Sequence, residues 1–151
     1  MTEPAAAFSV GDSLEAGQVV TPERTAIHIG SGALRVFATP SMALLVERTC
    51  RDLMEPGLPP GQTSVGVEIR VRHLAPTPLG GKVRIRVEIT GIHGQTVDFK
   101  AEIWDEAELV GLVEHRRCVI DSERFLRRVR KKADQVPSRE GEPGDPSAGE
   151  D

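Results

Sequence analysis

The sequence contains one long helical pattern, and this pattern limits the folds available to the chain. In residues 40–54, apolar side chains recur at the helical spacing and form a stripe, with charged residues on the opposite side. Thr39 is expected to be the N-cap, and Pro40 fits the first turn. The segment "EPGLPPG" at 55–61 ends the helix. The apolar stripe consists of Met42, Leu45, Val46, Thr49, Cys50 and Leu53.

The segments after this helix alternate between apolar and polar residues, as half-buried strands do. They are residues 63–73, 82–90, 96–104 and 109–120, joined by short turns into an antiparallel meander. In the first strand, Val65, Val67, Ile69 and Val71 are expected to share one face, which also carries His73.

The order of elements predicts an α+β domain, in which an antiparallel sheet wraps around one long helix. This arrangement is the hot-dog fold. Residues 16–29 are expected to add one or two N-terminal strands, and a short helix follows Asp121 and Ser122. One helix cannot cover six strands, so exposed edges predict a homodimer with a continuous sheet.

Length and composition indicate one globular domain. The chain has 151 residues, 38% of them hydrophobic and 28% charged. No apolar stretch is long enough to span a membrane, and the N-terminus lacks the pattern of a secretory signal. Cys50 and Cys118 stand alone, which argues against a disulfide framework or a zinc site. The cytoplasm is the expected location.

The C-terminal part carries an uneven charge. Residues 121–132 contain six basic residues and two acids, whereas residues 133–151 contain six acids and one arginine. The basic helix could bind phosphates, but a solvated terminal helix is the simpler interpretation. The scarcity of aromatic residues gives nucleic-acid binding little support. We therefore divide the chain into a loose N-terminus at 1–13, a domain at 14–132 and a disordered acidic tail at 133–151.

Three polar side chains are candidates for one site. Thr39 stands at the start of the helix, Glu47 lies at the margin of its buried face, and His73 ends a strand on the face that meets the helix. Each has a plain structural explanation, as a cap, a solvated acid or a structural histidine. Together, a hydroxyl, a carboxylate and an imidazole could carry acyl transfer. A nearby imidazole would also offset the cost of a desolvated carboxylate, so Glu47 and His73 are expected within bonding reach of each other. Gly66, inside a strand of branched residues, marks either a bulge or a close approach to a ligand, where its N–H could serve an oxyanion.

The remaining histidines have simpler interpretations. His93 is expected in a solvated turn, and His28 lies in an unclear N-terminal segment. His115 shares a strand face with Arg117, which favours a structural pairing over catalysis. No metal-ligand cluster is visible in the sequence, so no metal is proposed.

Three blocks, "FATPSMALLVERTC", "SVGVEIRVRHLAPTP" and "EHRRCVI…ERF", resemble the hot-dog thioesterases related to the fluoroacetyl-CoA-specific thioesterase. The resemblance covers residues 8–132 and implies a catalytic set of Thr39, Glu47 and His73. It also implies that Gly66 contacts the thioester and that Arg117 supports the acid. The family's aromatic lid before the helix has no counterpart in "HIGSGALRV", and this departure implies a broader or different acyl-CoA substrate rather than selectivity for fluoroacetyl.

The resemblance implies an enzyme that hydrolyses a short or small acyl-CoA thioester, with CoA as part of the substrate and no separate cofactor. Two alternatives stay open. One is a hydratase or dehydratase acting on acyl thioesters, and the other is a non-catalytic acyl-CoA-binding module. Neither nucleic acid nor a membrane is an expected partner.

Overall fold

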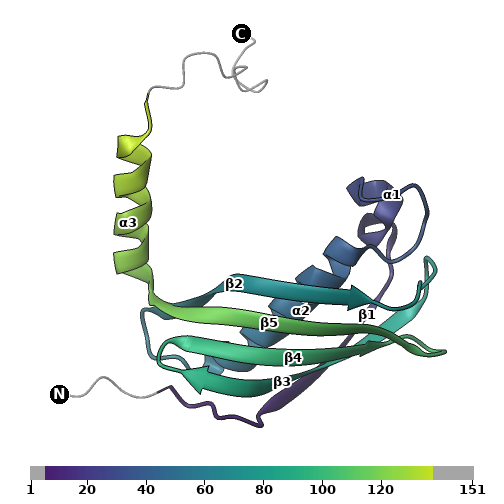
Figure 1. Ribbon diagram of the computed structural model, residues 1–151, viewed down its shortest axis with the longest axis horizontal. Coiled ribbons are helices and arrows are strands. Elements are labelled where there is room, and N and C mark those ends of the chain that lie inside the picture. The colour runs from purple at the N-terminus through teal and green to yellow at the C-terminus, as the bar shows by residue number, and fades with distance from the viewer. Residues whose placement is uncertain (1–5, 138–151) are drawn as a thin grey trace.

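One curved sheet and one long helix form the core of the chain (Figure 1). The computed structural model describes residues 6–137. The strands are β1 Ser13–Val19, β2 Gln62–His73, β3 Lys82–His93, β4 Thr96–Trp104 and β5 Leu109–Asp121, in the sheet order β1-β3-β4-β5-β2. All neighbouring strands are antiparallel. The predicted four-strand meander is wrong, because β2 pairs with β5 and not with β3, so only β3, β4 and β5 follow one another in the sheet. The helices are α1 Ala26–Ile29, α2 Thr39–Met54 and α3 Ser122–Gln135, with 3-10 turns at Pro22–Arg24 and Glu55–Gly57.

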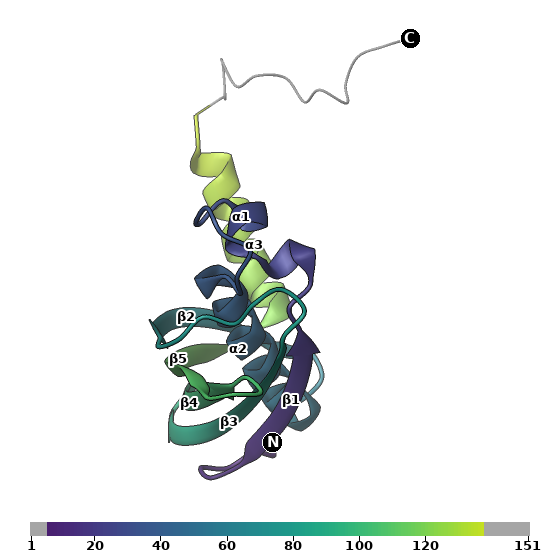
Figure 2. The same ribbon diagram turned by 90° about the vertical axis from the view of Figure 1, so that its right-hand side faces the viewer.

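The long helix α2 packs against the concave face of the sheet (Figure 2). The alternation predicted for β3 and β4 is confirmed, because their inward residues are at most 2% exposed. These residues are Val83, Ile85, Val87 and Ile89 from β3, and Val97, Phe99, Ala101 and Ile103 from β4. The helix stripe is buried as predicted, except that Met54 is fully buried where Leu53 is only half-buried. The expected α+β fold is therefore confirmed.

The N-terminal segment differs from the expectation. The prediction of a second N-terminal strand within residues 16–29 is wrong, because the chain turns at Pro22–Arg24 and then forms the short helix α1. Gly30 ends α1 in the left-handed conformation, with φ of 88°, which glycine adopts without steric cost. Residues 25–37 thus wrap the N-terminal end of α2 instead of adding a strand to the sheet.

The N-cap prediction for Thr39 is also wrong. The helix already begins at Thr39, Ala38 occupies the cap position, and no side chain caps this end. Pro40 lies in the first turn, as expected. The hydroxyl of Thr39 is consequently available for a contact outside the helix.

Strand β2 contains a β-bulge that the simple alternation does not show. Gly66 pairs with Arg117 and Glu68 with Arg116, so Val67 has no partner on β5. Val67 is 56% exposed, and the expectation that it faces inward is wrong. The bulge shifts the alternation by one residue, so the inward face carries Ser64 and Gly66 before it and Ile69, Val71 and His73 after it.

The C-terminal helix α3 leaves the sheet and projects beyond β2 (Figure 1). Asp121 caps it as predicted, because its carboxylate accepts from the Arg124 backbone N–H at 2.9 Å. The helix includes residues 133–135, the first part of the predicted tail, and the tail from residue 138 on lies outside the described residues. Within residues 6–137, no helix is long and apolar enough to cross a membrane.

The bulge makes a testable prediction about stability. Deletion of Val67 removes the unpaired residue, so a regular strand keeps both halves of β2 facing α2. We expect the free energy of unfolding to fall by less than about 1 kcal/mol. Deletion of the paired and exposed Arg70 should lower it by more than about 2 kcal/mol, because the strand could restore its register only by losing the bulge, which would turn Glu68 inward in place of Ile69. Urea denaturation measures both, and equal stability of the two variants would contradict this role of the bulge.

Candidate active site

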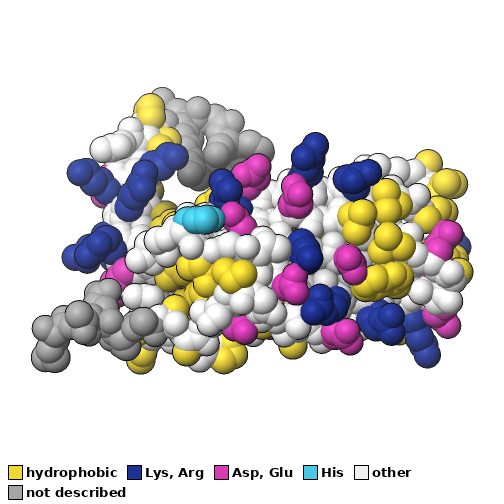
Figure 3. All heavy atoms as spheres, turned by 60° about the horizontal axis from the view of Figure 1, so that its bottom comes forward, with side chains coloured by type: hydrophobic (Ala, Val, Ile, Leu, Met, Phe, Trp, Pro, Cys, Tyr) yellow, Lys and Arg dark blue, Asp and Glu magenta, His cyan; other side chains and the backbone are white. Residues whose placement is uncertain are grey.

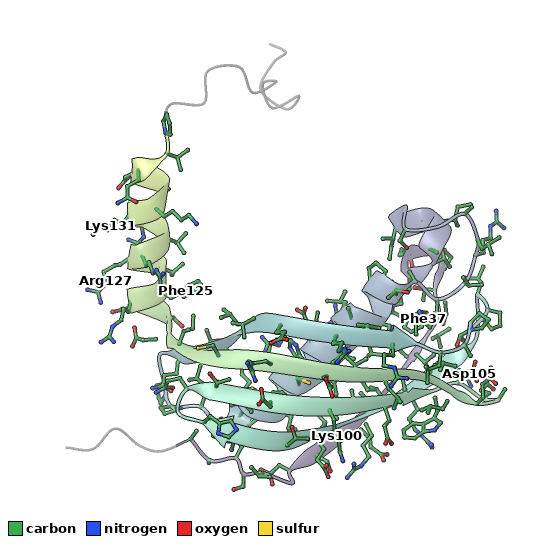
Figure 4. All side chains as sticks on the ribbon, viewed as in Figure 1. Phe37, Lys100, Asp105, Phe125, Arg127 and Lys131 are labelled. Atoms are coloured by element: carbon green, nitrogen blue, oxygen red, sulfur yellow. The ribbon has the colours of Figure 1, made fainter. Side chains whose placement is uncertain are left out.

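Thr39 and His73 meet at the N-terminal end of α2. The Thr39 Oγ1 lies 2.8 Å from the His73 Nδ1, so the two side chains are hydrogen-bonded. The ring of Phe37 meets that of His73 edge to face, with centroids 6.3 Å apart, beside the start of the helix (Figure 4). Phe37 is buried, and its ring fixes the position of the imidazole.

The other ring nitrogen of His73 is buried without a partner. Among residues 6–137, its Nε2 is the one buried side-chain nitrogen or oxygen atom without a hydrogen bond. Burial lowers the pKa of His73 below its ordinary value, which favours the neutral imidazole at neutral pH. A neutral imidazole has one donor and one acceptor nitrogen. The hydrogen-bonding capacity of Nε2 is therefore not used within the described residues.

Glu47 lies further along α2, beneath Gly66 of strand β2. A Cβ built on Gly66 would lie 3.7 Å from the Glu47 Oε2 and 3.6 Å from the Arg117 Nη1. It would also lie 3.2 Å from the His115 Cε1, closer than side chains ordinarily approach. The absence of a side chain at Gly66 therefore lets a carboxylate, a guanidinium and an imidazole approach the backbone of β2 closely.

Arg117 is a buried cation with an extensive set of hydrogen bonds. It is 5% exposed, and its Nε donates to the Ser64 Oγ at 2.8 Å and its Nη2 to the Ser64 carbonyl oxygen at 3.1 Å. Its Nη1 lies 3.1 Å from the His115 Nε2. These contacts offset the cost of removing the charge from water. The proximity of Arg117 to Glu47 places opposite charges on two sides of Gly66.

His115 completes this buried set. Its Nδ1 lies 2.7 Å from the Glu68 carbonyl oxygen, to which it donates, and this leaves Nε2 to accept from Arg117. Burial, together with the charge of Arg117, lowers the pKa of His115 and keeps the ring neutral. The predicted pairing of His115 with Arg117 is therefore confirmed.

The five predicted site residues form two groups in the structure. Thr39 and His73 make one group, and Glu47, Gly66 and Arg117 make the other. No hydrogen bond or ion pair joins Glu47 to His73 within the described part of the chain, so the expected direct contact between them is absent from a single subunit. The separation has a simple cause, because eight residues of α-helix advance about 12 Å along the axis.

Sequence reasoning missed Ser64, which holds Arg117 in place. In a regular strand Ser64 would face away from His73, and only the bulge brings both residues to the inner side. Gly66 was the signal available in the sequence, because a glycine inside a strand marks a bulge. Its presence alone did not show which half of the strand is shifted.

The sequence of this chain matches a known family over most of the domain. The sequence profile of the family described as fluoroacetyl-CoA-specific thioesterase matches residues 20–123. A fluoroacetyl-CoA thioesterase of Streptantibioticus cattleyicolor is 33% identical over 129 residues, which cover 82% of this chain and 93% of that relative. The chain belongs to this family.

Solved structures agree with the membership in the fluoroacetyl-CoA-specific thioesterase family. A variant of the fluoroacetyl-CoA-specific thioesterase FlK aligns with a TM-score of 0.78 at 33% identity, covering 85% of this chain and 99% of that one. A Thermus thermophilus protein described as a thioesterase superfamily member aligns with a TM-score of 0.76 at 26% identity. The alignment covers 85% of this chain and 97% of that one. Variants of FlK have been solved with fluoroacetate and CoA, and with acetyl-CoA.

These comparisons confirm the sequence-based expectations of a hot-dog fold and of a thioester hydrolase. The chain is an acyl-CoA thioesterase of this family, and an identity of 33% does not carry fluoroacetyl specificity over to it. The matched residues 20–123 include all five predicted site residues and end at the start of α3.

The buried His115 predicts a pH-dependent stability. Its pKa is lowered on folding, so below about pH 6.5 the unfolded chain binds more protons than the folded one. The free energy of unfolding should therefore fall as the pH drops from about 7 to about 5. His115→Gln, which does not titrate, should show a shallower fall, whereas His28→Gln on the exposed helix α1 is the matched control. Urea titrations at several pH values measure the slopes, and identical slopes for wild type and His115→Gln would contradict the assignment.

Proposed function

We propose that this chain hydrolyses small acyl-CoA thioesters with Glu47, Thr39 and His73 as its catalytic residues. The observation that carries the proposal is the close approach of the Glu47 carboxylate to the backbone of β2 at Gly66. A thioester carbonyl bound beside Gly66 would lie near an acid and the backbone of a bulged strand. Both are needed for hydrolysis, one to activate the attacking group and one to stabilise the oxyanion.

The reaction requires a nucleophile, an oxyanion donor and a proton donor for the leaving thiolate. Glu47 would take a proton from water, whose oxygen attacks the carbonyl carbon, or would attack directly to give a mixed anhydride that water then cleaves. The N–H of Gly66 would donate to the oxyanion. When the carbon–sulfur bond breaks, the proton that Glu47 took from water would pass through His73 to the thiolate of CoA, and Glu47 would return to its carboxylate; on the anhydride route the thiolate would take its proton from the water that cleaves the anhydride. Thr39 would hold the imidazole through its Nδ1.

A homodimer formed along β2 would bring the two groups of site residues together. Among the described strands, β2 is at the edge of the sheet and pairs with β5 only. Antiparallel pairing of two copies along this edge places the C-terminal half of one β2 beside the N-terminal half of the other. The partner subunit's His73 would then approach Gly66 and Glu47 of this chain.

The substrate would be a small acyl group, without selectivity for fluoroacetyl. Before α2, residues 30–36 are without an aromatic side chain, and Leu34 is 67% exposed there. Phe37 is buried against His73, so its ring is not available to fold over an acyl group. A site without an aromatic lid would discriminate weakly between small acyl groups. We place the enzyme in the cytoplasm, where CoA thioesters are formed.

The catalytic assignment predicts the effect of two substitutions. Glu47→Gln removes the base and His73→Ala removes the proton donor, so each should lower kcat/KM for acetyl-CoA by about 10²–10⁴-fold. Release of free thiol measures the rate, and thermal unfolding checks that each variant is folded. Arg48→Gln, a change of the exposed neighbour on α2, should leave the rate nearly unchanged.

Activity retained in both Glu47→Gln and His73→Ala would refute the assignment. Crotonyl-CoA separates hydrolysis from the alternative chemistry of the fold, because hydration consumes the double bond without releasing thiol. Wild-type hydration of crotonyl-CoA without thiol release would replace the proposed reaction by that of a hydratase.

A further inference from the structure

The helix α3 lies outside the part of the chain that matches the family, and its chemistry is not used by the proposed reaction. It starts where the Ser122 N–H donates to the Gly61 carbonyl oxygen, beside the N-terminal end of β2. Lys and Arg side chains gather on this projecting helix (Figure 3). No side chain of α3 is buried within the described residues, so these charges are open to a ligand.

A cavity of about 340 Å³ lies at the base of α3, within the range of small-molecule sites. Its lining combines two cations, an aromatic ring, two amides and a short stretch of β5. The lining residues are Gln62, Gln95, Val119, Ile120, Asp121, Arg124, Phe125 and Arg128. The carboxylate of Asp121 is engaged as the cap of α3, so the side chains of Arg124 and Arg128 determine the charge offered to a ligand.

We propose that this cavity binds the 3′-phosphoadenosine part of CoA, an inference that rests on the proposed function. Arg124 and Arg128 would bind the phosphates, since guanidinium groups recognise phosphate oxygens in bidentate fashion. Phe125 is 37% exposed and offers a face on which adenine stacks. The amides of Gln62 and Gln95 match the donor and acceptor atoms on the edge of adenine.

The position of the cavity fits the length of the substrate. Gln62 and Gly66 are on the same strand, four residues apart, which corresponds to about 13 Å. Both belong to the inward-facing side of β2 before the bulge. The phosphopantetheine arm of CoA spans such a distance between the thioester and the nucleotide. The strand that presents Gly66 to the acyl group thus also leads to the nucleotide cavity.

The first test is the binding of adenosine 3′,5′-bisphosphate, measured by calorimetry on the full chain. Wild type should bind it, and the double variant Arg124→Ala/Arg128→Ala should bind at least about tenfold more weakly, because charge-assisted hydrogen bonds are lost. The matched control is Arg127→Ala/Arg130→Ala, which removes the same charge from residues of α3 that do not line the cavity. No binding by wild type, or equal weakening in both double variants, would overturn the proposal.

The second test separates this inference from the proposed function. For acetyl-CoA, Arg124→Ala/Arg128→Ala should raise KM by about tenfold or more while kcat stays within about twofold. For the acetyl thioester of N-acetylcysteamine, which has no nucleotide, the same variant should match wild type. Loss of activity on both thioesters would overturn the nucleotide role. Absence of thiol release by wild type would instead overturn the proposed function and leave the binding experiment as the test of the cavity.

Discussion

The alternation of side chains along β2 is the constraint on which the site depends. Gly66 and His73 are seven positions apart, and an odd separation in a regular strand puts two residues on opposite faces. The unpaired Val67 corrects this by shifting the second half of the strand by one residue. Both residues then face α2, which carries Thr39 and Glu47. The position of one exposed valine therefore decides whether the site residues share a side of the sheet.

A buried cation stabilises the strand at this point. Arg117 would be costly to bury alone, and it is accommodated because Ser64 and His115 accept its hydrogen bonds. Ser64 precedes the bulge, and His115 donates to the carbonyl oxygen of Glu68, which follows it. The network thus joins β5 to both sides of the bulge. It also directs positive charge to the space beside Glu47, where an attacking carboxylate or an oxyanion would be stabilised.

The fold could be predicted from the sequence because its two periods are clear. The helical stripe of α2 and the alternation in β3 and β4 each leave one arrangement that buries the apolar residues. Local irregularities were less predictable. The segment between α1 and α2 is held in part by the Phe37 N–H, which donates to the carbonyl oxygen of Thr77, a residue distant in the sequence.

The residues of the site were easier to predict than their geometry. Chemistry and resemblance pointed to Thr39, Glu47 and His73. In the structure, Thr39 and His73 are hydrogen-bonded to each other. The contact expected between Glu47 and His73 is not made in one subunit, because two helical turns separate Glu47 from Thr39. A sequence gives the order of residues on a strand, but not the shift caused by a bulge.

The central claim is that Glu47 acts with the partner subunit's His73 at Gly66. Mixed dimers of Glu47→Gln and His73→Ala chains, purified through two different tags, test it most directly. If the site is shared, one of the two sites in each mixed dimer is intact, and thiol release should recover to about half of the wild-type rate. If all site residues come from one chain, the mixed dimer stays as inactive as its parents, and this result would contradict the account.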